Sequence, residues 1–584
     1  AFNQSRGILV NSLLNGDSAS GLEIRNNTID TVRGTGGNAD QTIGIQFLEE
    51  SNGDGLIETV VVDGNTVTDL LDNRSSQGIN FNGNIEGDIT NNNISTLNTD
   101  RPGADLGFTQ AIALNAGGNA GSPPQNVDIS GNSISNLDDQ TPSSESFRAT
   151  HIILSSVDDV GTIDITNNEF TAVASDENYI LDRATGDFDL QGALGANTFA
   201  PDTVQVTRNS DRVLVPETGV DVVNVDQNTG FDQIQPAVDG ANPGDTIEVT
   251  AGMFNESQLS VNVPGLTIEG SGDTVIDNTA GGGATVRTIA TDITITNLTV
   301  TNSGGGNGFD IPTTQNASGL RLDDVTVSNT SIAFFNDLTT NGEAADDVEK
   351  DFSNVVFSDV TIENSERKGI YTEALSDAVF DNVTIDGVTS DSYGFNGGID
   401  INLKYDDYEN ITIRDSTVAN ISEGDPFRDD PSFSSAIAVK ARDDPSSYDE
   451  NPATLADVTV ENVVIEDSFN GLRIGEPGVD YSAGPSGPSN VTITNSTLQN
   501  NSGFHIEDVP GDLDLSATLS TQSNSFDRTV TIADTEGTLT DGIFSSIQTS
   551  VTAADAGDTV AVGSGTFEES VTIEKANLTL EGPN

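Results

Sequence analysis

Apolar and polar residues alternate in short segments along most of the chain, a pattern typical of β-strands. In residues 1–207 these segments carry a recurring phrase, an Asn followed by a polar and then an apolar residue. The phrase begins at Asn27, Asn65, Asn92, Asn132, Asn168 and Asn197. The spacings of 38, 27, 40, 36 and 29 residues fit one coil of stacked strands plus a loop of variable length.

The Asn of this phrase has a structural explanation. Asn tolerates left-handed backbone geometry, and its amide can bond to copies of itself above and below. We therefore expect each Asn to mark a sharp turn and to join a side-chain ladder, as in other stacked parallel strands.

A similar phrase continues in the second half of the chain, where Asp often replaces Asn. It begins at Asn297, Asp324, Asp359, Asn382, Asp415, Asn462, Asn495 and Asn524. The shortest spacing, 23 residues, approximates a bare coil, and the longest is 47. The largest loops are expected within 422–435 and 442–456, where several Pro residues disfavour strands.

One stretch, residues 231–256, is repeated 313 residues later at 544–569. Its first half places apolar residues at helical spacing, and its second half turns at Gly-Asp and then alternates as a strand does. The residues that the two copies share are Phe231, Ile234, Gln235, Val238, Ala241, Gly244, Asp245, Thr246, Gly252, Phe254 and Glu256.

This stretch resembles the N-terminal cap of pectin-lyase-like right-handed parallel β-helices. The resemblance implies an all-β fold of tandem right-handed parallel β-helices with short amphipathic capping helices. We expect a β-helix lacking its cap over 1–207, a complete capped β-helix over 208–530, and a linker, cap and first strand of a further β-helix over 531–584.

Both ends of the sequence read as parts of a coil. If Asn584 is joined to Ala1, Leu578 lies 33 residues before Asn27, close to the spacing of 31 residues from Leu266 to Asn297. We therefore expect end-to-end self-association, either as a covalent tandem array or as a filament whose subunits complete each other's β-helix.

Composition narrows the classes of partner. The net charge is −70, from 92 acidic and 22 basic residues, which disfavours nucleic acid and anionic membranes as partners and favours solubility in high salt. The sequence contains no run of 18 apolar residues, so it does not predict a membrane-spanning helix. Cysteine is absent, so cysteine usage does not indicate the compartment. The repeat architecture and the Asn-x-Ser/Thr sequons, which permit glycosylation, lead us to expect an extracellular or cell-surface location.

Tyrosines and basic residues concentrate between 367 and 473. Two coils there share a local phrase, Leu403-Lys404-Tyr405-Asp406-Asp407 and Val439-Lys440-Ala441-Arg442-Asp443-Asp444, which stacking would bring together. Aromatic faces, cations and carboxylates are typical of acidic-glycan binding, with or without Ca²⁺, and the alternative is surface ion pairing. The glycan-binding candidates are Tyr371, Lys404, Tyr405, Tyr408, Lys440, Arg442 and Arg473.

The same patch contains the residue types of a polysaccharide lyase or glycoside hydrolase. Lyases need a base such as Lys or Arg, and hydrolases need two opposed carboxylates. The candidates are Lys404, Asp406, Asp407, Lys440, Arg442, Asp443 and Asp444, of which the four aspartates are also the candidate Ca²⁺ ligands. Yet the Trp-Ile-Asp-His, Gly-His-Gly and Asp-Pro-His motifs of enzymes with this fold are absent.

Two functions are therefore expected. The first is a structural extracellular repeat protein, a segment of a surface adhesin or filament that binds acidic polysaccharide or Ca²⁺ and requires no cofactor. The alternative is a secreted polysaccharide lyase or glycoside hydrolase acting at the 367–473 patch. The fold by itself does not decide between them.

Overall fold

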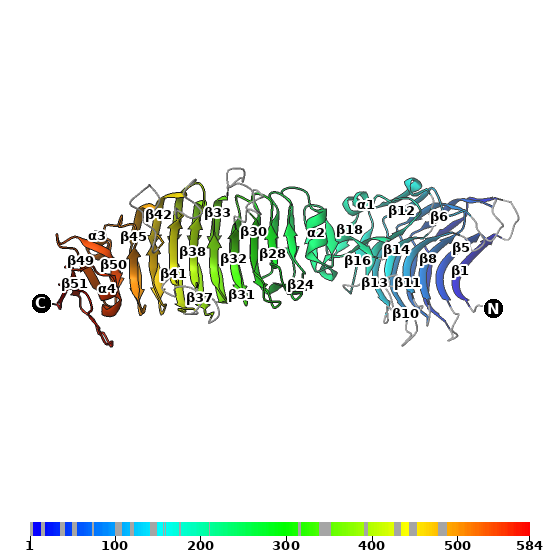
Figure 1. Ribbon diagram of the computed structural model, residues 1–584. Coiled ribbons are helices and arrows are strands. Elements are labelled where there is room, and N and C mark those ends of the chain that lie inside the picture. The colour runs from blue at the N-terminus through cyan, green and yellow to red at the C-terminus, as the bar shows by residue number, and fades with distance from the viewer. Residues whose placement is uncertain are drawn as a thin grey trace. The chain divides into compact units, whose positions relative to one another are not determined.

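The computed structural model describes residues 4–12, 18–34, 41–49, 55–72, 75–99, 108–116, 122–139, 149–155, 157, 159–174, 177–208, 211–312, 317–337, 352–390, 395–424, 434–442, 452–476 and 488–583. The chain forms two compact units, Ala1–Asp232 and Gln233–Asn584. Each unit is a stack of coils, and each coil contributes strands to three parallel sheets (Figure 1). We call these the first, second and third sheets, in the order in which the second unit enters them; the first unit begins in the third sheet.

In the described part of the first unit, six strands belong to each sheet. Its first sheet holds β2 (Ala19–Ser20), β3 (Glu23–Arg25), β6 (Ile57–Asp63), β9 (Ile85–Thr90), β12 (Val127–Ser130) and β15 (Ile163–Thr166). Its second sheet holds β4 (Thr28–Arg33), β7 (Thr66–Asp72), β10 (Asn93–Thr99), β13 (Ser133–Asp139), β16 (Glu169–Thr171) and β18 (Thr198–Ala200). Its third sheet holds β1 (Gln4–Ser12), β5 (Gln41–Glu49), β8 (Ser75–Asn82), β11 (Phe108–Asn115), β14 (Thr150–Ser155) and β17 (Asn178–Arg183).

The last part of the first unit leaves this pattern. It contains α1 (Leu190–Ala196), β19 (Thr203–Arg208), β20 (Asp211–Pro216), β21 (Val222–Asn224) and β22 (Thr229–Phe231), with 3₁₀ turns at Val160–Thr162 and Glu217–Gly219. The strand β20 pairs antiparallel with both β17 and β19. Valines of these strands pack on Ala113, Ile153 and Leu181, which face outward from the third sheet.

The second unit repeats the three-sheet coil. Its first sheet holds β23 (Thr246–Val249), β26 (Thr267–Gly270), β29 (Thr294–Thr301), β31 (Arg321–Ser328), β33 (Ser353–Ser358), β36 (Ser376–Asp381), β39 (Asp407–Arg414), β42 (Thr454–Glu461) and β45 (Pro488–Thr494). The strands β29 and β31 continue into its second sheet, with β24 (Gly252–Asn255), β27 (Thr274–Asp277), β34 (Thr361–Ser365), β37 (Thr384–Val388), β40 (Thr417–Ile421), β43 (Val464–Glu466), β46 (Thr497–Gln499) and β48 (Ser525–Phe526).

The third sheet of the second unit holds β25 (Leu259–Val261), β28 (Val286–Thr288), β30 (Phe309–Pro312), β32 (Ile332–Asp337), β35 (Lys368–Thr372), β38 (Gly397–Leu403), β41 (Ser435–Ala441), β44 (Leu472–Ile474) and β47 (Phe504–Asp508). The chain then forms α3 (Leu515–Ser520), β49 (Val530–Ala533), β50 (Leu539–Phe544), α4 (Ile547–Ala553), β51 (Thr559–Val562) and β52 (Thr579–Glu581). Here β50 pairs antiparallel with β47.

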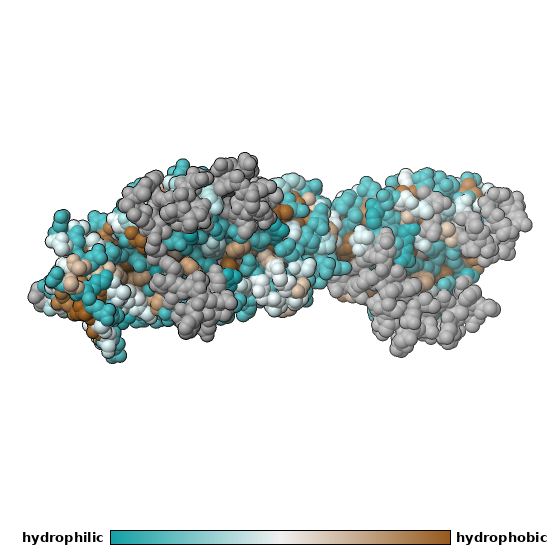
Figure 2. All heavy atoms as spheres, in the orientation of Figure 1, coloured by the Kyte–Doolittle hydropathy of each residue, from teal (hydrophilic) through white to brown (hydrophobic). Residues whose placement is uncertain are grey.

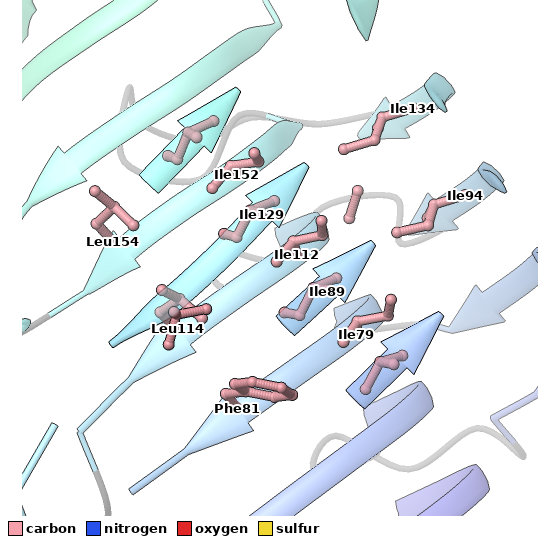
Figure 3. Packing of buried hydrophobic residues seen from close by; sticks show 14 of the residues in the cluster. Ile79, Phe81, Ile89, Ile94, Ile112, Leu114, Ile129, Ile134, Ile152 and Leu154 are labelled. Atoms are coloured by element: carbon pink, nitrogen blue, oxygen red, sulfur yellow. The ribbon is translucent and has the colours of Figure 1, made fainter. Parts of the chain in front are cut away.

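The interior of each stack is apolar, which explains the alternating sequence pattern. In the first unit, Ile79, Ile112 and Ile152 occupy matching positions in successive coils and are fully buried (Figure 3). Such columns of like residues bury apolar surface in every coil, and each Å² buried stabilises the fold by about 25 cal/mol. The architecture confirms the expected all-β solenoid, a parallel β-helix.

The expected asparagine ladder is present in the first unit. Each of its inner rungs is a buried Asn whose amide Nδ2 donates to the Oδ1 of the Asn in the next coil. The donations run from Asn65 to Asn92 at 3.0 Å, from Asn92 to Asn132 at 3.0 Å, from Asn132 to Asn168 at 2.9 Å and from Asn168 to Asn197 at 2.9 Å. The same Oδ1 also accepts a backbone N–H, as Asn92 does from Asn65 at 2.9 Å, so the ladder ties side chain and backbone together.

In the first unit, the residue that makes the left-handed turn is not the Asn of the ladder. In the first unit the positive φ belongs to the residue before the ladder Asn, for example Asn91 (φ 54°) or Gly131 (φ 66°). In the second unit the phrase residue itself has the positive φ in every coil but the last, where Ser523 has it and not Asn524. Asn382 (φ 53°) is one example, and its amide bonds to Asp359 at the surface. The expectation that one Asn performs both roles is therefore wrong, because turning the backbone aims the side chain outward.

The repeated stretch forms a helix and a strand in both copies, as expected. The helix α2 (Ile234–Gly240) buries Ile234, Ala237 and Val238, and β23 follows its Gly-Asp turn. Glu256 accepts a hydrogen bond from the N–H of Ile234 at 3.1 Å, and Glu569 accepts one from Ile547 at the start of α4 at 2.7 Å. The shared Glu thus caps the helix N-terminus, which explains why it recurs.

The described surface is mostly hydrophilic on the face shown in Figure 2. The large exposed apolar side chains of the described residues are scattered along the chain; they are Leu9, Val173, Met253, Ile573 and Leu580. None of the described helices has the length and apolar character needed to cross a membrane.

Candidate functional site

A pocket of about 450 Å³ opens on the outward face of the third sheet of the second unit. We call it the third-sheet pocket. Strands β32, β35, β38 and β41 and the residues next to them supply most of its wall. Its lining residues are Asn307, Ile332, Phe335, Asp337, Arg367, Lys368, Tyr371, Glu373, Phe395, Asp400, Asn402, Lys404, Lys440 and Arg442.

A buried charge triad lies in this pocket. The carboxylate of Asp400 on β38 lies between the ammonium groups of Lys368 on β35 and Lys440 on β41, and Lys440 Nζ is 3.0 Å from Asp400 Oδ1. All three side chains are nearly fully buried. One carboxylate balances only one of two ammonium groups, so the triad retains one positive charge.

The triad shifts the pKa values of two of its members. Burial alone would raise the pKa of Asp400, but the charges and hydrogen bonds of Lys368 and Lys440 hold it well below its usual range. Burial lowers the pKa of the Lys440 ammonium, and the attraction of Asp400 offsets this only in part because Lys368 repels Lys440. Asp400 is therefore ionised, and Lys440 gives up its proton more readily than an ordinary lysine.

A second network lies beside the triad. Glu373 accepts hydrogen bonds from the Tyr371 hydroxyl and the Lys404 ammonium, and Asn402 Nδ2 donates to the Tyr371 oxygen at 3.0 Å. Arg442 forms an ion pair with Glu476 at 2.8 Å. Burial, then the negative charges of Glu373 and Asp400, raise the pKa of Tyr371, so its hydroxyl stays protonated.

Aromatic rings complete the pocket. Phe335 and Tyr371 stack with ring centres 5.7 Å apart and planes inclined by 15°. The Lys368 and Lys440 ammonium groups lie 5.4 and 5.5 Å from the centre of the Phe395 ring, within the range of cation–π attraction. Flat apolar faces beside fixed charges can hold the face of a sugar ring while the charges orient its substituents.

Four of the residues proposed from sequence line this pocket: Tyr371, Lys404, Lys440 and Arg442. Three others lie outside its lining. Tyr408 is buried and donates to the Lys404 carbonyl at 2.7 Å, and Tyr405 makes a left-handed turn (φ 69°). Arg473 lies on β44, where it pairs with Glu507 at 2.5 Å and faces the Phe504 ring at 5.2 Å.

Two of the four candidate aspartates can be placed in the structure. Asp406 and Asp407 are exposed at the start of β39 and are not part of the pocket lining. Asp443 and Asp444 lie outside the described residues. Within the described part of the chain, no group of three or more Asp, Glu or His side chains is arranged to hold a metal ion.

Coil stacking aligns the two shared phrases differently from their sequence match. The strands β38 and β41 pair Asn402 with Lys440 and Leu403 with Ala441. The alignment of the two phrases that places Lys404 opposite Lys440 is therefore wrong by two residues. In the observed register Lys440 lies opposite Asn402, and its ammonium reaches the carboxylate of Asp400.

Sequence reasoning missed several residues of the pocket, above all Asp400 and Glu373, which hold its cations. In a chain with 92 acidic residues, no single carboxylate stands out. One signal was available: Asp400 and Asn402 interrupt an otherwise apolar strand segment, Gly397–Leu403, in which every residue is buried. Polar side chains at such positions need partners, which the neighbouring coils supply.

No protein-family model matches the sequence, and no curated protein matches it significantly. Solved structures to which the chain is similar include an alginate lyase from Paenibacillus sp. str. FPU-7, at 17% identity and a TM-score of 0.31, covering 47% of this chain and 87% of that one. They also include the A-module of the mannuronan C-5 epimerase AlgE6 from Azotobacter vinelandii, at 9% identity and a TM-score of 0.24, covering 85% and 84%.

A third similar structure is a 1,3-α-1,4-β-D-galactose-4-sulfate-3,6-anhydro-D-galactose-2-sulfate 4 galactohydrolase, at 11% identity and a TM-score of 0.26, covering 63% of this chain and 89% of that one. At these TM-scores the likeness is too remote to transfer a function. The assignment of the chain to the parallel β-helix fold rests on the strand pairing described above.

Proposed function

We propose that the third-sheet pocket binds a segment of an acidic polysaccharide. One observation carries this proposal: the pocket lining has five cationic and three acidic side chains, and even with Glu476, which pairs with Arg442, the site keeps a net charge of +1 in a chain whose net charge is −70. A local excess of positive charge attracts anions that the rest of this acidic surface repels. The stacked Phe335 and Tyr371 rings add the flat apolar surface that a sugar ring needs.

The ligand class follows from the donors. Lysine and arginine side chains recognise carboxylate and sulfate groups, so both carboxylated and sulfated polysaccharides fit this chemistry. Such polymers occur outside cells, which agrees with the extracellular location expected from the sequence. The duplicated cap stretch at 231–256 and 544–569 further supports a repeat protein in which β-helix modules carry this binding surface.

Replacing Arg442 by Gln is expected to weaken binding of acidic oligosaccharides by about tenfold or more, because a charge-assisted hydrogen bond contributes about 1.5–3 kcal/mol. Calorimetric titration of the full chain with alginate, pectate and sulfated galactan oligosaccharides measures this and separates carboxylate from sulfate recognition.

Arg321→Gln is the matched control, since Arg321 is exposed on the first sheet of the same unit and its loss changes the net charge equally. Equal affinity of the Arg442 and Arg321 variants would mean that the ligand does not use the pocket. The absence of binding to any of the three anionic oligosaccharides would disprove the proposed function.

A second candidate function is cleavage of the bound polymer by β-elimination, because Lys440 and Tyr371, a base and a proton donor by residue type, line the same pocket. Burial makes the Lys440 ammonium easier to deprotonate. Once deprotonated, Lys440 would take the C5 proton of a uronate, the C4–O bond would break, and the Tyr371 hydroxyl would protonate the leaving oxygen, which leaves a C4=C5 double bond.

If this candidate is correct, alginate or pectate incubated with the protein should accumulate unsaturated ends, seen by ultraviolet absorbance. Tyr371→Phe should then lose most of this activity, by about 10²-fold or more, while still binding the oligosaccharide. A protein that binds these polymers without forming unsaturated ends has the binding function alone.

A further inference from the structure

The later cap, residues 544–583, repeats the geometry of the earlier cap, residues 231–270. In both caps the strand after the Gly-Asp turn pairs with the next first-sheet strand in one register, β51 with β52 and β23 with β26. In both, a Gln side chain of the helix accepts a backbone N–H from the segment that follows. These hydrogen bonds join Gln235 Oε1 to the Ser260 N–H at 2.7 Å and Gln548 Oε1 to the Thr572 N–H at 2.6 Å. The earlier cap therefore shows which contacts the later cap is built to make.

Two apolar side chains of the later cap differ in exposure from their counterparts in the earlier cap. Ile573 is 49% exposed, whereas its counterpart Val261 is fully buried. Leu580 on β52 is 44% exposed, whereas Ile268, at the matching position of β26, is fully buried. In the earlier cap the next coil covers both positions, because β25 pairs with β28 and β26 pairs with β29. Ile573 and Leu580 are therefore interior positions that no coil covers in the described structure.

The first coil of the first unit, residues 4–34, is open on one side. Among the described strands, β3 pairs only with β6 and β4 pairs only with β7, so each keeps an unpaired edge. On β1, Ile8 and Val10 are half-buried, whereas Ile45 and Phe47 opposite them on β5 are fully buried. Unpaired edges beside partly exposed interior side chains are a template for a strand of another chain.

The register in which β52 can pair with this coil follows from the second unit. There β29 covers β26, and Ile295 of β29 lies two residues before Asn297, whose φ is 57°. The first coil has the same order, with Ile24 of β3 two residues before Asn26, whose φ is 53°. Pairing β52 with β3 as β26 pairs with β29 therefore sets Leu580 opposite Ile24.

Charge favours the same arrangement. In this register Glu581, the residue after Leu580, lies opposite Arg25. The described part of the first coil carries three basic residues, Arg6, Arg25 and Arg33, against two acidic ones, although acidic residues outnumber basic ones 92 to 22 in the chain. Residues 565–583 carry four acidic residues and one basic residue. The two surfaces are thus of opposite net charge, which favours their association over contact between two like surfaces.

We propose that the later cap of one copy of this chain docks on the first coil of a separate copy, with β52 and β3 joined as parallel strands. Ile573 and Leu580 then become interior, and the backbone groups of both strand edges gain hydrogen bonds. Because each copy offers two different surfaces, the contact is heterologous and either continues into a filament or closes into a ring. The proposal goes beyond the polysaccharide binding proposed for the pocket and does not depend on it.

Sedimentation velocity of the full chain over a wide range of concentrations tests this proposal. At about 0.15 M salt, the Debye length of about 8 Å limits the repulsion between copies of net charge −70. The sedimentation coefficient should rise with concentration. Leu580→Asp should weaken association by about tenfold or more, because the interface would bury an unpaired charge. Met253→Asp is the matched control and should associate as the wild type does, since Met253 is an exposed residue of the earlier cap and the added charge is equal.

Charge reversal tests the register. Glu581→Arg and Arg25→Glu should each weaken association by about two- to fivefold, the effect of an exposed ion pair, and the double variant should associate more tightly than either single variant. Thermal unfolding of each variant checks that both units remain folded.

Three results would overturn the proposal: a monomer at every concentration, association that Leu580→Asp leaves unchanged, or a double variant no tighter than the single ones. Loss of acidic-polysaccharide binding with association intact would overturn the pocket function alone.

Discussion

Replacing Asp400 by Asn is expected to lower the free energy of unfolding of the second unit by about 3–5 kcal/mol, the usual effect of removing one partner of a buried ion pair. The substitution keeps the shape of the side chain and removes its charge. The ammonium groups of Lys368 and Lys440 would then remain buried without the carboxylate that they share. Urea denaturation measures the change, and hydrogen exchange of β38 assigns the transition to the second unit.

Asp381→Asn is the matched control, because Asp381 pairs with Arg414 at the surface of the same unit. Exposed pairs contribute about 0–1 kcal/mol, so this variant should unfold almost as the wild type does. Combining Lys368→Met, Asp400→Leu and Lys440→Met should restore most of the stability, since an apolar replacement of the whole triad leaves no buried charge. Equal effects of the Asp400 and Asp381 variants would show that the triad is not buried as described.

Acid titration should report the same interaction. The folded-state pKa of Asp400 is lowered, so its contribution to stability is fully present above the pKa of an unfolded Asp, about 3.9, and is lost as pH falls toward the lowered value. The stability difference between wild type and Asp400→Asn should therefore be constant at neutral pH and shrink below about pH 4.

Replacing Asn92 by Ala is expected to lower the free energy of unfolding of the first unit by about 2–4 kcal/mol, because buried groups lose their partners. Asn92 Oδ1 accepts from the Asn65 backbone N–H at 2.9 Å, and its Nδ2 donates to the Val62 carbonyl at 2.9 Å. Both groups would be left in an interior that water does not reach. Urea denaturation with hydrogen exchange of β9 and β10 measures the effect.

Asn27→Ala provides the control within the same ladder. Asn27 is its exposed end, and the Asn65 oxygen to which it donates would still accept the Asn27 backbone N–H at 2.9 Å. We expect this variant to lose less than about 1 kcal/mol. Equal losses in the free energy of unfolding for Asn27→Ala and Asn92→Ala would contradict the idea that burial makes the ladder stabilising.

The fold could be predicted from sequence because its determinants are local. Each of these determinants lies within a segment of about 25 residues. They are the alternation of the strands, the turn-forming Asn and Asp residues, and the helix, Gly-Asp turn and Glu of the cap. The ladder was expected because a repeated Asn can bond only to its own copies when coils stack. The position of the left-handed turn was not predicted correctly, because it depends on which of two adjacent residues points inward.

The candidate site was predicted in part. Tyr371, Lys404, Lys440 and Arg442 were identified because tyrosines and cations are scarce in this chain and concentrate in one region. Asp400 and Glu373 were missed, and the shared phrases of two coils were aligned two residues out of register. Which side chains face each other across coils depends on the strand register, which loops of variable length conceal.

The sequence by itself therefore determined the coil, the cap, the ladder and the region that carries the unusual charges. The tertiary structure decided what those charges do. By pairing Asn402 with Lys440, it set Asp400 between two lysines from neighbouring coils, 32 and 40 residues away along the chain, and buried all three. Burial shifts the pKa values of these groups, and two lysines that share one carboxylate leave one positive charge. The interruption of the apolar segment Gly397–Leu403 by Asp400 hints at a partner, but the strand register decides which side chains that partner has.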